Sequence, residues 1–130
     1  MRGLLLFWMT VLTIGALIGC GGNSSDARKE PIQMELEDLA AFLTALPTDG
    51  VKPPKNMEEF MPREPMAPMA ADSLNRGELI YFWGADLRDG GESIIAYQKD
   101  AEANGGWVLL ENGKVIRMTP EKFKSAPKAK

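Results

Sequence analysis

The only cysteine of this 130-residue chain, Cys20, stands at the end of an apolar run that opens the sequence. Arg2 is the one charged residue before it, and the apolar run extends from Gly3 to Ile18. A cation, an apolar stretch of this length and a small residue at the cut, here Gly19, are typical of a secretory signal that is removed from the mature protein. The sequence therefore predicts that residues 1–19 are cleaved off and take no part in the fold.

The residues at the predicted cut are Leu17-Ile18-Gly19-Cys20, followed by Gly21. They resemble the lipobox of bacterial lipoproteins, in which the cysteine thiol receives a diacylglyceryl group and becomes the new N-terminus. The resemblance implies that Cys20 is lipidated and that the exported domain is held on a membrane by lipid. Under the sorting rule of diderm bacteria, Gly rather than Asp at position 21 implies the outer membrane, with the domain facing the periplasm.

Two other interpretations of this segment stay open. An uncleaved membrane anchor needs about 20 apolar residues, and the stretch from Gly3 to Gly19 is marginally short for it. Plain secretion would leave a lone free thiol on an exported chain, and such a thiol needs an explanation that lipidation supplies. The sequence therefore favours the lipoprotein interpretation over both.

Composition excludes several classes of function. Without Arg2 the mature chain carries 14 basic and 18 acidic residues, a net charge of −4, which argues against a nucleic-acid partner. The sequence contains no histidine, so it lacks the commonest general base and metal ligand, and neither a Ser-His-Asp triad nor a usual zinc site can be built. Carboxylate pairs suit acid–base catalysis, but no context singles one out. We therefore expect no catalytic residues, no cofactor and no small-molecule substrate.

The sequence predicts that the remaining chain consists of a linker, one domain and a short tail. Residues 20–30 begin with the Cys20 that the lipobox resemblance implies is lipidated, and the residues after it are small, polar or charged, which predicts a flexible linker. Residues 31–126 are enough for a single domain of roughly 100 residues, and one cysteine excludes an internal disulfide, so packing must stabilise it. Residues 127–130, with Lys128 and Lys130, are predicted to be a solvated basic tail.

The first half of this domain carries helical patterns. A leucine face recurs at intervals of three and four residues between Pro31, a good first helical residue, and Pro47, which stops a helix: Leu36, Leu39, Leu43 and Leu46. We expect this helix to face the core; as an interfacial helix its acidic polar positions would suit an anionic bilayer poorly. Asn56 with Glu59 predicts a capped short helix, and residues 70–74 predict one more helical turn.

The second half carries strand patterns. Four apolar runs predict strands: Leu79–Trp83, Ser93–Tyr97, Trp107–Leu110 and Val115–Met118. Between the last two, Asn112-Gly113 predicts a two-residue type I′ turn. That turn would set the register, with Glu111 facing Lys114, Leu109 facing Ile116 and Trp107 facing Met118 on one side, and Leu110 with Val115 and Val108 with Arg117 on the other.

These patterns together predict an α+β fold, with an N-terminal helix packed on a small antiparallel sheet of about four strands. Thr119-Pro120-Glu121 predicts a short C-terminal helix that carries Phe123 back to the sheet. The leucine helix is expected on one sheet face, and the segment rich in Met and Pro on the other.

Two groups of residues invite a metal hypothesis. The methionines of the middle segment, Met57, Met61, Met66 and Met69, are soft ligands that suit copper(I), but Met also fills irregular gaps in cores. The loop from Asp86 to Glu92 offers carboxylates for calcium, but Arg88 supplies an opposing charge and the spacing is not that of an EF-hand. The sequence favours the structural interpretation of both groups, and no metal site is predicted.

The second half also carries a family resemblance. Its segments are Tyr81-Phe82-Trp83-Gly84, then Ile94-Ile95-Ala96-Tyr97-Gln98-Lys99-Asp100-Ala101, then Gly105-Gly106-Trp107-Val108-Leu109-Leu110-Glu111-Asn112-Gly113-Lys114-Val115, then Met118-Thr119-Pro120-Glu121-Lys122-Phe123. They resemble the C-terminal sheet of the pseudopilin-like proteins of planctomycete bacteria, which are similar to the heads of type II secretion pseudopilins. The chain departs from that pattern at Glu102, where the family has a histidine, at Asn112, where it has Asp, and at the lipobox, which replaces the prepilin helix.

The resemblance implies a small α+β head and no catalytic residues. We therefore expect a non-catalytic envelope lipoprotein, an interaction or structural module tethered to the membrane by lipid on Cys20, with another envelope protein as its partner. The alternatives are a lipid-anchored component of a type II secretion or pseudopilus-like system and, less favoured, a metal-binding periplasmic protein. An enzyme would need a pocket with converging polar groups, and the sequence offers no such constellation.

Overall fold

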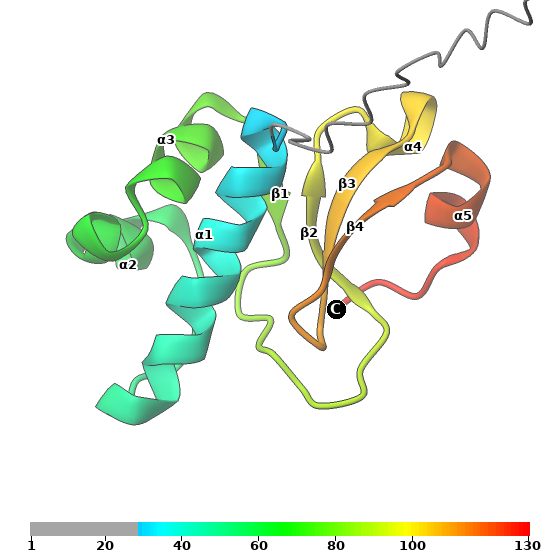
Figure 1. The fold of residues 1–130 in the computed structure, drawn as a ribbon. Coiled ribbons are helices and arrows are strands. Elements are labelled where there is room, and N and C mark those ends of the chain that lie inside the picture. Colours follow the sequence, from blue (N-terminus) through cyan, green and yellow to red (C-terminus); the bar gives the residue numbers. More distant parts are fainter. Residues whose placement is uncertain (1–28) are drawn as a thin grey trace, which may run out of the picture.

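A computed structural model describes residues 29–130, which form an antiparallel sheet with helices on both faces (Figure 1). The strands are β1 (Leu79–Tyr81), β2 (Ile94–Gln98), β3 (Gly106–Leu110) and β4 (Val115–Met118), and they lie in the order β1-β2-β3-β4. The predicted α+β class, with an N-terminal helix on a four-stranded sheet and a short C-terminal helix, is confirmed. Within residues 29–130, no helix combines the length and the apolar character needed to cross a bilayer.

The leucine helix is α1 (Pro31–Ala45), which carries three of the four predicted leucines, and all four are buried as predicted. The α-helix ends at Ala45, and a 3₁₀ turn, η1 (Leu46–Asp49), continues directly from it. Pro47 lies in the first turn of η1, where a proline is tolerated. Gly50 ends this turn with φ = 67°, and its N–H donates to Pro47 O. The last leucine of the face, Leu46, thus reaches the core from η1.

Two short helical segments follow. The predicted cap of α2 (Met57–Phe60) is confirmed, since Asn56 Oδ1 accepts the Glu59 N–H at 2.8 Å. The Glu59 carboxylate reaches back to the Lys55 N–H at 2.9 Å. A 3₁₀ segment, η2 (Met61–Met66), leads into α3 (Pro68–Arg76), which is longer than the single turn predicted.

The loop between β3 and β4 differs from the predicted two-residue turn. The backbone pairs Trp107 with Arg117, Val108 with Ile116 and Leu109 with Val115, one residue away from the predicted register. The Leu110 N–H donates to Lys114 O, so three residues form the loop, and Gly113 supplies its positive φ of 85°. A three-residue loop ending in a left-handed glycine is the next most common hairpin, and Asn-Gly fits it as well.

This register exchanges the two faces of β4. Arg117 lies on the side of α1, and Val115 packs into the core beneath that helix. Ile116 and Met118 lie on the opposite side, in the cluster around Phe123. The predicted pairs that placed Ile116 and Met118 with Leu109 and Trp107 are therefore wrong, because a one-residue slip sends each side chain to the other face.

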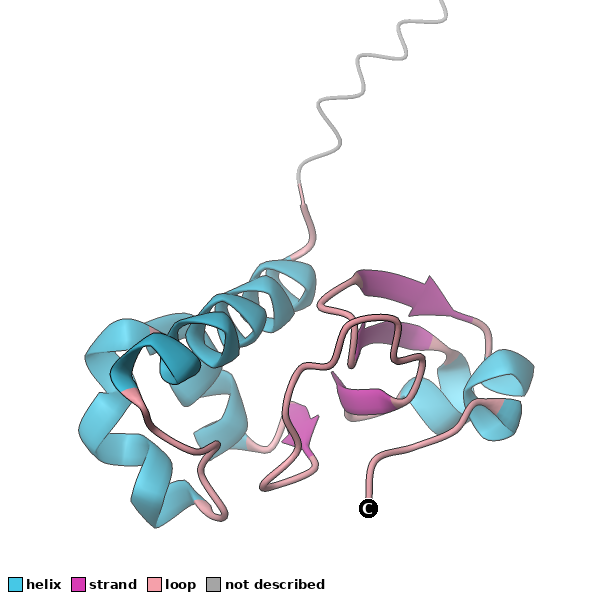
Figure 2. Cartoon of the chain, turned by 90° about the horizontal axis from the view of Figure 1, so that it is seen from below, coloured by secondary structure: helices cyan, strands magenta, loops and turns pink. Residues whose placement is uncertain are grey.

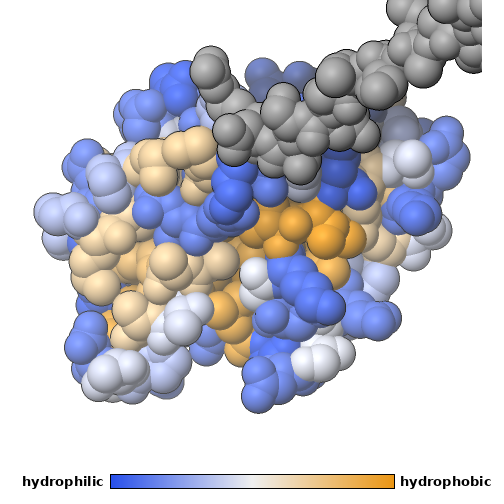
Figure 3. All heavy atoms as spheres, viewed as in Figure 1, coloured by the Kyte–Doolittle hydropathy of each residue, from blue (hydrophilic) through white to orange (hydrophobic). Residues whose placement is uncertain are grey.

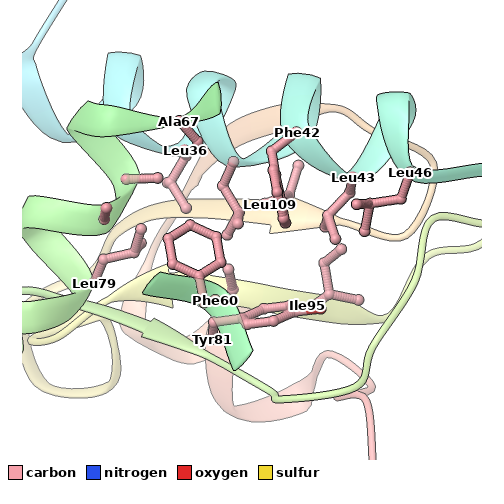
Figure 4. Close-up of a cluster of buried hydrophobic side chains, with 14 residues drawn as sticks. Leu36, Phe42, Leu43, Leu46, Phe60, Ala67, Leu79, Tyr81, Ile95 and Leu109 are labelled. Atoms are coloured by element: carbon pink, nitrogen blue, oxygen red, sulfur yellow. The ribbon is translucent and has the colours of Figure 1, made fainter. Parts of the chain in front are cut away.

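The main core lies between α1, α3 and the sheet (Figure 4). Fully burying one of its Leu or Ile side chains contributes about 1.5–3 kcal/mol. Phe60 enters this core from α2, with its ring centroid 4.9 Å from that of Phe42. The methionine- and proline-rich segment therefore packs beside α1, on the same side of the sheet, and not on the opposite face as predicted.

The opposite face is covered by the end of the chain (Figure 2). There α5 (Pro120–Ser125) buries Phe123, and its predicted cap is confirmed by Thr119 Oγ1, which accepts the Lys122 N–H at 3.3 Å. A further turn, α4 (Ala101–Asn104), was not predicted.

The predicted solvated tail is also wrong. Pro127 O accepts the Ile94 N–H at 2.8 Å, and the Ala129 N–H donates to Ile94 O at 2.9 Å. Lys128 Nζ donates to Phe123 O at 2.7 Å and lies 4.7 Å from the centre of the Phe123 ring. These contacts attach the end of the chain beside β2.

Candidate functional site

The predicted processing site lies outside the described residues. Gly19 and Cys20 precede residue 29, so cleavage and lipidation stay predictions from the sequence. What the structure describes is the place where the chain from Cys20 enters the domain, at Lys29 and Glu30. The candidate site therefore lies at this end of the domain.

Glu30 joins the start of α1 to the sheet. Its Oε2 accepts the Trp107 Nε1–H at 2.9 Å, and its Oε1 accepts from Arg117 Nη1 at 3.1 Å. Trp107 and Arg117 are paired residues on β3 and β4, so one carboxylate holds both strands. The predicted register missed this contact, because it placed Arg117 on the face turned away from Trp107.

Lys29 adds a second attachment at the same point. Its Nζ lies 2.8 Å from Glu37 Oε2, two turns along α1. Both side chains are more than a third exposed, so this ion pair contributes little to stability. Together with the contacts of Glu30, it attaches the first described residues to α1 and the sheet.

An acidic cleft of about 640 Å³ opens beside this point, between the start of α1 and the ends of β1 and β2. Its lining includes four carboxylates, one cation and one apolar residue: Glu30, Glu35, Glu78, Asp100, Lys99 and Ile32. Arg117 pairs with Glu30, and Arg76 pairs with Glu35 and Glu78, but the carboxylates still outnumber the cations. The remaining negative charge in a hollow with a partly apolar wall favours a cationic group. Ammonium or guanidinium groups of a partner suit the cleft best.

Glu35 is the most enclosed carboxylate of the cleft. Its side chain is 13% exposed, and Oε1 lies 3.8 Å from Arg76 Nη2. Its other oxygen is buried and has no hydrogen-bond partner among the described residues. Arg76 is shared with Asp72 at 3.0 Å and Glu78 at 2.9 Å, so Glu35 holds the weakest of its three ion pairs.

The methionines of the middle segment divide into two kinds. Met57 packs against the main core, which confirms the gap-filling interpretation for that residue. Met61, Met66 and Met69 are 41–45% exposed, so that interpretation is wrong for them. Met34 on α1 joins them as a fourth exposed large apolar side chain among residues 29–130.

The acidic loop after β1 is held by local contacts. Arg88 Nε lies 3.0 Å from Glu111 Oε2, and Asp86 Oδ1 accepts the Leu87 N–H at 2.7 Å. In the described part of the chain, His, Cys, Asp and Glu side chains form no group of three or more that could hold a metal ion. The contact of Arg88 with Glu111 ties this loop to the residue that follows β3.

Tyr81 is an ionisable residue that the sequence did not single out. It is buried at the end of β1, and its hydroxyl donates to Ala85 O. Burial raises the pKa of Tyr81 above its ordinary value, and the nearby negative charge of Asp86 raises it further. Tyr81 serves as a structural hydrogen-bond donor in the turn after β1.

No protein-family description matches the chain, and neither the curated proteins nor the solved structures contain a significant match to it.

Proposed function

We propose that this protein is a non-catalytic lipoprotein of the bacterial envelope, an interaction or structural module tethered to the membrane by lipid on Cys20. The observation that carries the proposal is the position of the lone cysteine. It ends an apolar run, and residues 21–30, all polar, charged or small, separate it from the first helical residue, Pro31. A lipid at that position would tether the whole domain without interrupting any element of it.

The size of the anchor supports this arrangement. One acyl chain binds a bilayer only marginally, whereas two chains anchor a protein stably, at about 0.8 kcal/mol for each buried methylene. A diacylglyceryl group on Cys20 would therefore suffice. The linker predicted between Cys20 and Lys29 would then keep the start of the domain within about 30 Å of the membrane surface.

The acidic cleft supports the interaction part of the proposal. It lies beside Glu30, where the tether would enter, and it combines a hollow with several carboxylates. An envelope partner that offers Lys or Arg side chains would match this surface in charge. The proposed partner is therefore a basic segment of another envelope protein.

Metabolic labelling tests the anchor. Full-length protein expressed in a diderm host with labelled palmitate should carry the label and lose residues 1–19, as measured by intact mass. Cys20→Ala should carry no label, whereas Ser24→Ala in the linker should behave as the wild type. An unlabelled wild-type protein that stays in the membrane with its signal attached would instead support the uncleaved anchor.

Crosslinking in intact cells, followed by solubilisation and capture through a C-terminal tag, tests the partner. Glu35→Gln should reduce recovery of the crosslinked partner, whereas Glu92→Gln in the exposed loop should not. Recovery of secretion-system pseudopilins would favour the pseudopilus alternative. Equal recovery with Glu35→Gln and the wild type would exclude the cleft as the contact surface.

A further inference from the structure

Three exposed methionines lie on α1 and around the start of α3, and one of them, Met34, is close to the point where the tether enters. Met34 and Asp38 stand four residues apart on α1 and so share one face of that helix. Asp38 Oδ2 accepts the backbone N–H of Met69 at 3.0 Å, which places the start of α3 against that face. Met66 precedes Met69 by three residues, on the other side of the Ala67 cap. We call Met34, Met66 and Met69 the methionine face.

The methionine face is unusual for its exposure. Its three side chains are 39%, 45% and 42% exposed, and Met61 is the one other large apolar residue exposed to this degree among residues 29–130. Figure 3 shows moderately hydrophobic residues, mixed with hydrophilic ones, over α1 and the helices beside it, and the most hydrophobic ones between α1 and the strands. Flexible thioether side chains adapt to irregular apolar surfaces, so this face suits a soft or variable contact.

The length of the chain before the domain indicates what the face contacts. From Cys20 to Lys29 the linker spans at most about 30 Å, and Met34 follows Lys29 by little more than one helical turn. If lipid holds Cys20 in the membrane, the methionine face cannot leave the vicinity of the bilayer. A short linker also gives the bilayer surface a high effective concentration, so a contact too weak to form from solution still forms.

We propose that the methionine face docks on the bilayer to which the chain is tethered, which orients the domain on the membrane. This inference rests on the proposed anchoring through Cys20.

The charged residues around the methionine face indicate which lipid headgroups it can approach. Glu37 is paired with Lys29, and Asp38 is engaged by the start of α3, but both are carboxylates beside the face. The mature chain has a net charge of −4. An anionic bilayer would repel this surface, whereas a zwitterionic bilayer would leave the apolar contact unopposed.

Methionine oxidation tests the docking. Mature protein, residues 20–130, is coupled through the Cys20 thiol to a maleimide lipid in phosphatidylcholine vesicles. The comparison sample carries a water-soluble maleimide on Cys20 and is mixed with the same vesicles. After brief exposure to hydrogen peroxide, mass spectrometry measures oxidation at each methionine. We expect Met34, Met66 and Met69 to oxidise about threefold more slowly in the coupled sample, while Met118 on the opposite face is unchanged.

A second vesicle composition and two double variants extend the test. Vesicles with about 30% phosphatidylglycerol should weaken the protection. The double variant Met34→Gln with Met69→Gln should lose protection at Met66, whereas Met34→Leu with Met69→Leu should keep it. Circular dichroism of each variant checks that it is folded.

Three results would overturn the docking. The first is equal oxidation in the coupled and uncoupled samples, and the second is equal protection of Met118. The third is protection that rises with protein concentration without vesicles, which would assign the face to a second copy of the chain. Because the maleimide lipid replaces the natural anchor, each of these outcomes is independent of whether Cys20 is lipidated in cells.

Discussion

Asp38, in the middle of α1, caps the N-terminus of α3 by accepting the backbone N–H of Ala70, 32 residues further along the chain. The same oxygen, Oδ2, also accepts the N–H of Met69, and both distances are 3.0 Å. Ala67 occupies the cap position, and its methyl side chain cannot accept a hydrogen bond. One carboxylate thus satisfies two free donors of a helix and ties that helix to its neighbour.

Replacing Asp38 with Ala should destabilise the domain by about 1–2 kcal/mol, the usual cost of losing an N-cap. Asp38→Asn retains an amide oxygen and should lose less than Asp38→Ala. Urea unfolding followed by tryptophan fluorescence measures both values. If Asp38→Ala is as stable as the wild type, water replaces the carboxylate and the cap contributes nothing.

Gly105 and Gly113 differ in what an added side chain would cost. Both have positive φ, 71° and 85°, but an added Cβ at Gly105 would lie 2.7 Å from Met118 O, whereas at Gly113 it would meet nothing within 4 Å. Gly113→Ala should therefore cost about 1–2 kcal/mol for the left-handed conformation alone. Gly105→Ala should cost more, because φ of 71° with ψ of 168° is a conformation that essentially only glycine adopts, and because the added Cβ would also meet backbone atoms that cannot move aside cheaply. Equal losses in urea unfolding would mean that the chain relaxes at Gly105, both in its backbone conformation and around the clash.

How much the sequence could predict depends on the range of the interaction. The leucine face of α1 and the caps at Asn56 and Thr119 are local patterns, and each was confirmed. The cap of α3 comes from Asp38, which lies too far along the chain for any local pattern to reveal it. The same is true of the last residues, whose basic character predicted a solvated tail but whose backbone pairs with Ile94.

In the candidate site, one ambiguous turn determines whether the contacts of several residues could be predicted. Asn112-Gly113 is compatible with a two-residue turn and with a three-residue loop, and the choice decides the face of every β4 residue. With the wrong choice, Arg117 lay on the face opposite to Trp107, and the contact of both with Glu30 could not be predicted. The acidic cleft depends on the meeting of α1, β1 and β2, which is tertiary information.

The contact between Glu30 and Trp107 should affect local dynamics more than global stability. Glu30 and Arg117 are 52% and 61% exposed, so Glu30→Ala should cost less than about 1 kcal/mol. The indole N–H of Trp107 should nevertheless exchange faster with solvent, as measured by NMR, because it loses its acceptor. Glu92→Ala, in an exposed loop, serves as the control. An unchanged indole exchange rate in Glu30→Ala would show that the contact does not persist in solution.

Tyr81 should make the domain sensitive to alkaline pH. Its pKa is raised in the folded state by burial and by Asp86, so the folded protein binds the phenolic proton more tightly than the unfolded chain does. The stability from this group is fully present below the unfolded pKa of about 10 and is lost above it, by up to about 1.4 kcal/mol for each pH unit.

Tyr81→Phe isolates this effect from the other groups that titrate at high pH. At neutral pH the variant should be about 1 kcal/mol less stable, because Ala85 O loses its donor. It has no phenol to ionise, so its deficit relative to the wild type should shrink between about pH 9 and about pH 11. Urea unfolding of both proteins across this range measures the difference. A deficit that stays constant with pH would mean that Tyr81 ionises equally easily in the folded and unfolded chains.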